Sequence, residues 1–126
     1  MATQGNQIRQ TFVAGADLSA KQYTFVTCNG VTADGENRTV VSPAVGAKVD
    51  GVVINNPKNT YAATVVVFGR TKVKAGGAIP AGAEVQTNAN GQVIAATTGI
   101  RVGKALEAAV ANQIITIDFY PGGNAA

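Results

Sequence analysis

The sequence contains no histidine and no tryptophan, and Cys28 is its single cysteine among 126 residues. A single thiol excludes a disulfide within the chain, and without histidine the usual parts of a nucleophile–base pair or a zinc site are missing. Cys28 shares one side of a predicted strand with Thr24 and Val26, so we interpret it as a small core residue. No spacing of carboxylates picks out a pair for acid–base catalysis. We predict no catalytic residue, no metal site and no cofactor.

Charged residues are also scarce, at 13% of the chain, where globular proteins average about 25%. The net charge of +3 is too small to indicate nucleic-acid binding. Arg70, Lys72 and Lys74 alternate along one predicted strand, but no aromatic residues interleave with them as base stacking would require. We interpret this basic stripe as a solvated strand edge, where lysine discourages unwanted pairing.

Long apolar runs are missing as well. No segment approaches the roughly 18 consecutive apolar residues that a membrane-spanning helix needs. The N-terminal residues MATQGNQIRQTF include no apolar run of signal-peptide length. We therefore expect no membrane association, and synthesis and retention in a cytoplasm-like compartment.

What the sequence does have is glycine, 15 residues of it, between short runs of valine, isoleucine and threonine. Such runs predict β-strands, and the glycine-containing segments between them predict tight turns, above all Asn90-Gly91. Ile115, Ile117 and Phe119 alternate with polar residues and should face one side of the last strand. The expected strands are residues 12–14, 23–28, 39–41, 48–55, 61–68, 70–75, 84–87, 92–96, 100–107 and 114–120.

Residues 104–111 are ambiguous, because KALEAAVA has good helix propensity but is only about two turns long. A strand that ends near Glu107, followed by a turn, is favoured over a short helix. The chain as a whole is predicted to be an all-β protein, a compact β-sandwich or tulip-like β-barrel of short strands. Its expected organisation is an extended N-terminal arm over residues 1–12, one β domain over residues 13–121 and a tail over residues 122–126.

The arm is polar and contains Gly5, which discourages regular structure. Arms of this kind become ordered when a neighbour holds them, so we expect it to lie along another subunit. Ile8 and Phe12 would be its apolar anchors, and Arg9 would pair with an acidic group there.

A faint internal repeat links the two halves of the chain. Residues 51–54 align with residues 103–106, and residues 64–68 with residues 116–120, both at an offset of 52 residues. Residues 14–20 also align with residues 75–81. Two similar β units packed face to face, or chance similarity among segments rich in alanine, glycine and valine, both account for this pattern.

Several short motifs follow one another in a recognisable order. They are a G-x-x-I-x-A-G turn at residues 76–82, the Asn90-Gly91 hairpin, the segment VGKALEAA at residues 102–109, and LSAKQYTFV at residues 18–26. Together they resemble the capsid decoration (cement) proteins of tailed bacteriophages. The resemblance implies a mainly β fold made in the host cytoplasm, assembled as a homotrimer on the outer surface of an icosahedral head, and clamping neighbouring major capsid protein subunits. The turn adds Gly76, Gly77, Ile79 and Pro80 as candidate contacts with the capsid or with another subunit.

Two other functions stay open from the sequence. A β-rich carbohydrate-binding or adhesion module displayed on a phage particle is the alternative, although few aromatic residues are available to stack on sugars. A lipoyl-like carrier would need a modified lysine at a hairpin tip, and the tip at residues 88–91 has none.

Overall fold

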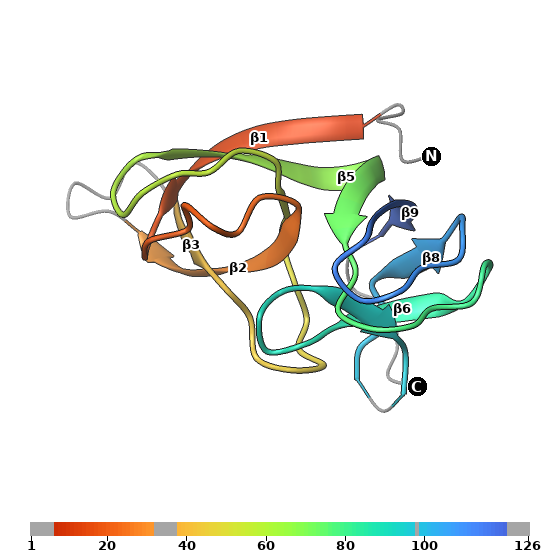
Figure 1. Cartoon of the computed structure of the whole chain (residues 1–126). Helices are drawn as coiled ribbons and strands as arrows, with labels where there is room; N and C mark the ends of the chain where they lie inside the picture. Colours follow the sequence, from red (N-terminus) through yellow and green to blue (C-terminus); the bar gives the residue numbers. More distant parts are fainter. Residues whose placement is uncertain (1–6, 32–37, 98, 121–126) are drawn as a thin grey trace.

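The computed structural model describes residues 7–31, 38–97 and 99–120, and these contain strands and turns but no helix (Figure 1). The strands are β1 (Gln7–Ala14), β2 (Thr24–Val31), β3 (Arg38–Val41), β4 (Gly51–Val53), β5 (Ala62–Lys74), β6 (Glu84–Thr87), β7 (Val93–Ala95), β8 (Gly103–Ala105) and β9 (Ile114–Phe119). The all-β prediction is confirmed. The ambiguous segment is also resolved, because β8 ends at Ala105 and a turn follows it.

Strands β1 to β5 close into a barrel. Their order is β1-β3-β2-β4-β5, and β1 returns to pair with β5 antiparallel, from Gln7 opposite Gly69 to Val13 opposite Ala62. The other neighbours are antiparallel as well, except that β1 and β3 run parallel at Val13 and Ala14. Of the two predicted architectures, the closed barrel is therefore the one that forms.

The C-terminal half of β5 continues into a second ring in the order β5-β9-β8-β6-β7. Gly69 marks the passage, since it pairs with Gln7 on β1 and with Phe119 on β9 and has a φ of 111°. A parallel bridge between Ala75 and Val93 brings β7 back to the end of β5. The predicted strands 61–68 and 70–75 are thus one strand shared by two rings, which we call the first barrel and the second barrel.

The two barrels have the same strand pairing. Val52 on β4 lies opposite Val66 on β5, and 52 residues later Lys104 on β8 lies opposite Asp118 on β9. The chain reversals before β5 and β9 also match, because Thr60 and Asn112 both have a positive φ, 72° and 69°. A shared register on two pairs of strands is not a chance similarity.

The interiors of the two barrels match position by position. The core of the first barrel is Phe12, Ala14, Leu18, Val26, Val40, Val53, Ala63 and Val65. The equivalent residues of the second barrel are Val73, Ala75, Ile79, Val85, Val93, Ala105, Ile115 and Ile117, and all of them belong to its core. The predicted repeat is confirmed, but each unit closes into its own ring instead of the two packing into one sandwich.

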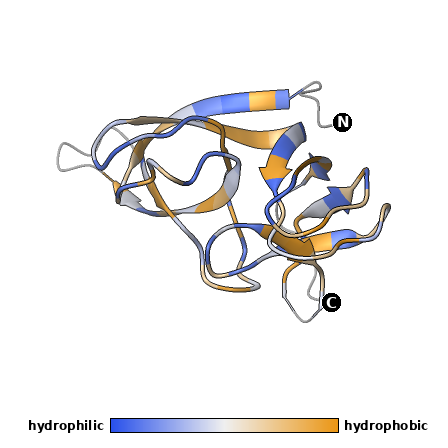
Figure 2. Ribbon diagram, viewed as in Figure 1, coloured by the Kyte–Doolittle hydropathy of each residue, from blue (hydrophilic) through white to orange (hydrophobic). Residues whose placement is uncertain are grey.

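The first barrel also completes the core of the second. Phe25, Val49 and Val52 belong to the first barrel, yet they are members of the buried cluster of the second. The ring of Phe25 lies 6.0 Å from the ring of Phe119, centroid to centroid, and the Phe25 amide donates a 2.7 Å hydrogen bond to the Gly91 carbonyl. Figure 2 shows hydrophobic residues along much of β5, which runs through both cores. The joint between the barrels is therefore apolar and buried.

Much of the predicted arm is a strand of the first barrel. Gln7–Ala14 forms β1, which pairs with β5 along its length, and the Phe12 side chain is buried in the core. The backbone pairing outweighs the polar composition, because the side chains of residues 9–11 face solvent while the main chain bonds to β5. The boundary predicted at residue 12 is wrong. Residues 1–6 of the arm and the predicted tail at 122–126 lie outside the described residues.

Candidate functional site

A surface hollow of about 450 Å³ opens where β5 passes from the first barrel to the second. Its lining residues are Phe68, Gly69, Arg70, Asp118, Phe119 and Tyr120. They lie on adjacent strands, because Gly69 is opposite Phe119 and Arg70 is opposite Asp118. The hollow is thus built by the junction of the two barrels.

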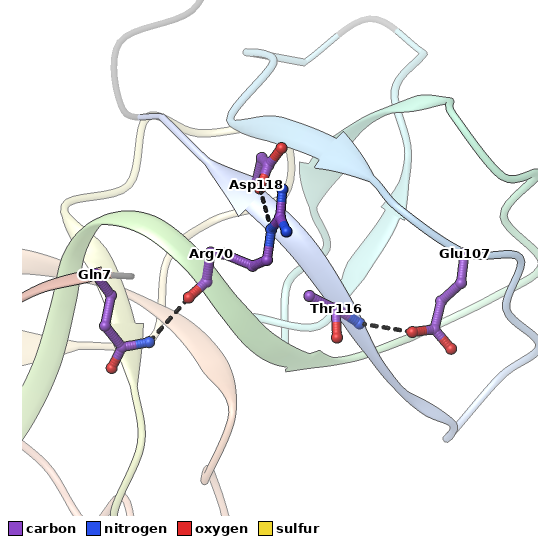
Figure 3. A network of polar contacts seen from close by, with 5 residues as sticks. All are labelled: Gln7, Arg70, Glu107, Thr116 and Asp118. Carbon is purple, nitrogen blue, oxygen red and sulfur yellow. Dashed lines mark hydrogen bonds and ion pairs between the residues drawn. The ribbon is translucent and has the colours of Figure 1, made fainter. Parts of the chain in front are cut away.

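Polar contacts tie three strands together beside this hollow (Figure 3). Arg70 Nε donates to Asp118 Oδ1 over 3.0 Å, and Gln7 Nε2 donates to the Arg70 carbonyl over 2.9 Å. The two ion-pair side chains are 51% and 42% exposed, so water screens their attraction and the pair adds little to stability. Further along β9, the Thr116 amide donates to Glu107 Oε2 over 3.4 Å. These contacts join β1, β5 and β9 at the surface.

Tyr120 is one of the polar residues that line the hollow, with Arg70 and Asp118. Burial raises the pKa of its phenol, and the carboxylate of Glu84 raises it further. Glu84 Oε1 in turn accepts a 3.2 Å hydrogen bond from Arg101 Nη1. The phenol therefore stays neutral at physiological pH and can both donate and accept hydrogen bonds.

Two exposed apolar residues lie together at this hollow, Phe68, which lines it, and its neighbour Ile8. Ile8 on β1 and Phe68 on β5 are register partners, and 57% and 54% of their surfaces are exposed. A single exposed apolar residue needs no explanation, but an adjacent pair beside a hollow is typical of an interaction site. We call Ile8 and Phe68 the apolar rim.

The three predicted contact residues on β1 differ in their exposure to solvent. Ile8 and Arg9 are exposed, and Arg9 Nε donates to the Gln7 side-chain oxygen rather than to an acidic group in the described structure. Phe12 is wrong as an external anchor, because its ring fills the core of the first barrel. The predicted pairing of Arg9 with an acidic group of another subunit stays a prediction.

The predicted contacts in the turn between β5 and β6 lie on the second barrel. Ile79 is only 2% exposed and exchanges backbone hydrogen bonds with Ala109, so its side chain is core and its prediction as a contact is wrong. Gly76 donates to the Val93 carbonyl and is half-buried, as is Gly77, whereas Pro80 is exposed. The predicted residues therefore fall on two different barrels and do not form one site.

The basic stripe lies on the half of β5 that belongs to the second barrel. Arg70, Lys72 and Lys74 are on β5, and all three pair with residues of β9. Lys72 Nζ lies 5.9 Å from the centre of the Tyr23 ring. Along the stripe the strand pairings of β5 are with β9 alone, because its pairing with β1 ends at Gly69 and its pairing with β4 ends at Val66. The interpretation as a solvated strand edge therefore stays a prediction.

Phe68, Tyr120 and the Arg70–Asp118 pair were not predicted as site residues. A usable signal was present, because the internal repeat aligns Phe68 with Tyr120 and so places an aromatic residue at the end of two matched predicted strands, 61–68 and 114–120. The apolar run before Phe68 is typical of a buried strand, and it predicts burial of Phe68 instead. An exposed aromatic that follows a buried valine run is a signal that pattern reading passes over.

The described residues offer little for chemistry at a metal or a thiol. No group of three or more His, Cys, Asp or Glu among them could hold a metal ion. Among the described residues, no helix is long and apolar enough to cross a membrane. Cys28 is half-buried against the core of the first barrel, and burial, followed by the nearby Asp50 carboxylate, raises the pKa of its thiol.

No family model matches the sequence, and no curated protein sequence matches it. The fold is similar to a solved structure, the crystal structure of the N base of head fiber gp8.5 in bacteriophage phi29. The TM-score is 0.73, and the match covers 90% of this chain and 94% of that chain at 17% sequence identity. At this identity the match establishes the fold.

Proposed function

We propose that this chain is a structural protein of a bacteriophage head that decorates its outer surface and stabilises it by contacting neighbouring major capsid protein subunits. The observation that carries this proposal is the similarity, over nearly the whole chain, to the base of a phage head fiber. The motifs that resemble phage decoration proteins point independently to the same part of a virion. The proposal includes assembly as a homotrimer and no enzymatic activity.

The surface suits a protein that binds another protein. The apolar rim and the hollow next to it combine exposed apolar area with a neutral phenol and an ion pair. Interfaces between proteins typically place aromatic and arginine side chains beside such apolar area. We propose that the apolar rim, Ile8 and Phe68, contacts the major capsid protein.

Heads assembled without this protein should close normally but release their genome at a lower temperature than decorated heads. The physical reason is that a ligand which binds only the intact shell stabilises it by mass action. Genome release during a temperature ramp, followed with a DNA-binding dye, measures the difference. If no closed heads form without the protein, it is a component of the shell or a scaffold instead.

Replacing both residues of the apolar rim, Ile8→Ser and Phe68→Ser, should weaken binding to undecorated heads by about tenfold or more. Burial of one such side chain contributes about 1.5–3 kcal/mol, and 1.4 kcal/mol corresponds to a factor of ten in affinity. Cosedimentation with heads measures the change. The control is Val45→Ser, which changes an apolar residue that is 64% exposed elsewhere on the first barrel. Equal binding by both variants would exclude the apolar rim from the interface.

A second candidate function is carbohydrate binding on a phage particle. The observation that favours it is Phe68, an exposed aromatic ring beside a hollow that also carries Arg70, Asp118 and Tyr120. Aromatic faces with nearby hydrogen-bonding groups suit sugar rings. A glycan array tests this function, and the Phe68→Ser variant should lose any signal that the wild-type chain gives.

A further inference from the structure

The internal repeat identifies pairs of equivalent residues in the two barrels. In several of these pairs, one residue lies where the barrels join and the other lies at an outer end. The face of the first barrel that lies against the second carries residues that are at most 1% exposed. We call it the joint face. It consists of Phe25, Val49 and Val52, which belong to the buried cluster of the second barrel, and of the buried Val66, the register partner of Val52. The equivalent residues on the second barrel, which we call the charged face, are Glu84, Arg101, Lys104 and Asp118.

The strand pairing fixes this correspondence. Phe25 lies opposite Val52 as Glu84 lies opposite Lys104, and Val52 lies opposite Val66 as Lys104 lies opposite Asp118. The fourth position follows from equal 2.9 Å hydrogen bonds, because the Asp50 amide donates to the Val26 carbonyl and the Val102 amide donates to the Val85 carbonyl. Val49 and Arg101 each precede one of these donors.

Four apolar residues on one barrel are therefore replaced by two cations and two anions on the other. Glu84 and Lys104 are exposed, and Arg101 and Asp118 are half-exposed. Glu84 pairs with Arg101 and Asp118 pairs with Arg70, so no single sign of charge dominates the face. A surface of this kind is soluble alone and can recognise a partner that carries charges of both signs.

The first barrel has a matching surface that nothing in its own described chain covers. In the second barrel, Thr87, Val102 and Phe119 lie at the end that receives the joint face, and they are at most 1% exposed. Their equivalents in the first barrel are Cys28, Asp50 and Val67, which we call the open end. Cys28 and Val67 pack against the core but are only half-buried, and Asp50 is exposed.

The open end also carries charges of both signs. Asp50 Oδ2 accepts hydrogen bonds from the Cys28 amide and the Thr27 hydroxyl over 2.7 Å and 3.1 Å. The exposed Arg38 lies close enough to lower the pKa of Cys28, against the effect of Asp50. The open end therefore has an anion and a cation to set against the cations and anions of the charged face.

We propose that the charged face of one copy binds the open end of another copy, in the arrangement by which the joint face meets the second barrel within one chain. The occupant is thus a second copy of this chain, and the contact is heterologous, with different surfaces on its two sides. The joint within the chain forms during folding and is apolar. A contact between folded copies must instead leave each copy soluble before it binds, and the charged residues of this face keep it soluble. This inference rests on the proposed function for the assembly of several copies on a head.

The test crosslinks two chains that each carry one cysteine. One is the wild-type chain, whose only cysteine is Cys28 at the open end. The other is Cys28→Ala with Glu84→Cys at the charged face, and it carries a distinguishable tag. A short bismaleimide should crosslink the mixture into heterodimers at least tenfold more than it crosslinks either chain alone. The control chain carries Cys28→Ala with Val110→Cys in place of Glu84→Cys. Val110 is 64% exposed and lies on a turn of the second barrel.

Each outcome decides between two roles for the charged face. Either it binds a second copy, or it is a simple polar cap, the kind of outer surface with which terminal repeats prevent further stacking. Heterodimers with Glu84→Cys but not with Val110→Cys support the proposal. Equal crosslinking with both, or none with either at high concentration and on undecorated heads, overturns it and leaves a polar cap. If the chain binds heads without heterodimers, the proposed function stands and this inference fails; heterodimers without head binding give the opposite result.

Discussion

Replacing Gly51 or Gly103 by alanine should lower the free energy of unfolding by about 3 kcal/mol, the upper end of the range for overpacking a core. A Cβ at Gly51 would lie 2.3 Å from Val65 Cγ1 and 2.6 Å from the Val66 carbonyl oxygen, and a Cβ at Gly103 would lie 2.4 Å from the Asp118 carbonyl oxygen. Backbone oxygens inside a sheet cannot move away as a flexible side chain can. The two glycines are equivalent in the repeat, so both substitutions should act by the same clash.

Urea denaturation of the two variants measures the loss, with Gly77→Ala as the matched control. A Cβ at Gly77 would have its nearest neighbour, Ile94 Cγ2, at 4.0 Å, which is an ordinary contact. The control should change the free energy of unfolding by no more than about 0.5 kcal/mol. Unchanged stability of both Gly51→Ala and Gly103→Ala would show that β4 and β8 do not approach β5 and β9 this closely.

Truncating Phe25 to alanine should cost about 3–5 kcal/mol, as expected for the loss of a fully buried aromatic side chain. Phe25 is 0% exposed, and it is the residue of the first barrel that stacks near Phe119 in the second. Its loss opens a cavity at the joint, where it affects the packing of both barrels. We expect the wild-type chain to unfold in one transition and the variant to unfold earlier, with its two barrels less tightly coupled.

Differential scanning calorimetry tests this expectation, and Phe68→Ala is the control that removes the same side chain from an exposed position. Phe68 is 54% exposed, so its truncation should cost less than about 1 kcal/mol. If Phe25→Ala and Phe68→Ala are destabilised equally, the joint is not a structural element and the barrels fold independently.

The local signals in the sequence predicted the strands well, because period-two alternation and Asn-Gly turns are determined by nearby residues. Ile115, Ile117 and Phe119 are buried as their alternation indicates, and Asn88 Oδ1 caps the predicted hairpin by accepting hydrogen bonds from the Asn90 and Gln92 amides. Both features depend on the chain within a few residues.

What the sequence did not reveal depends on partners distant along the chain. β1 reads as a polar arm because its exposed side chains dominate its composition, while its pairing partners on β5 lie 49 to 62 residues away along the chain. Ile79 reads as a surface turn residue, yet its backbone pairs with Ala109 and its side chain fills the second core. The hollow was missed for the same reason, since Phe68 and Tyr120 meet only when β5 and β9 pair.

The most direct test of the proposed role is to add the purified chain to bacteriophage heads that were assembled without it. We predict saturable binding to the outside of closed heads, in a fixed ratio to the major capsid protein, seen by cosedimentation and as added density in electron cryomicroscopy. The bound density should accommodate the two barrels, with the apolar rim of Ile8 and Phe68 facing the shell. Absence of binding under conditions where the chain is folded would contradict a role in decorating the head.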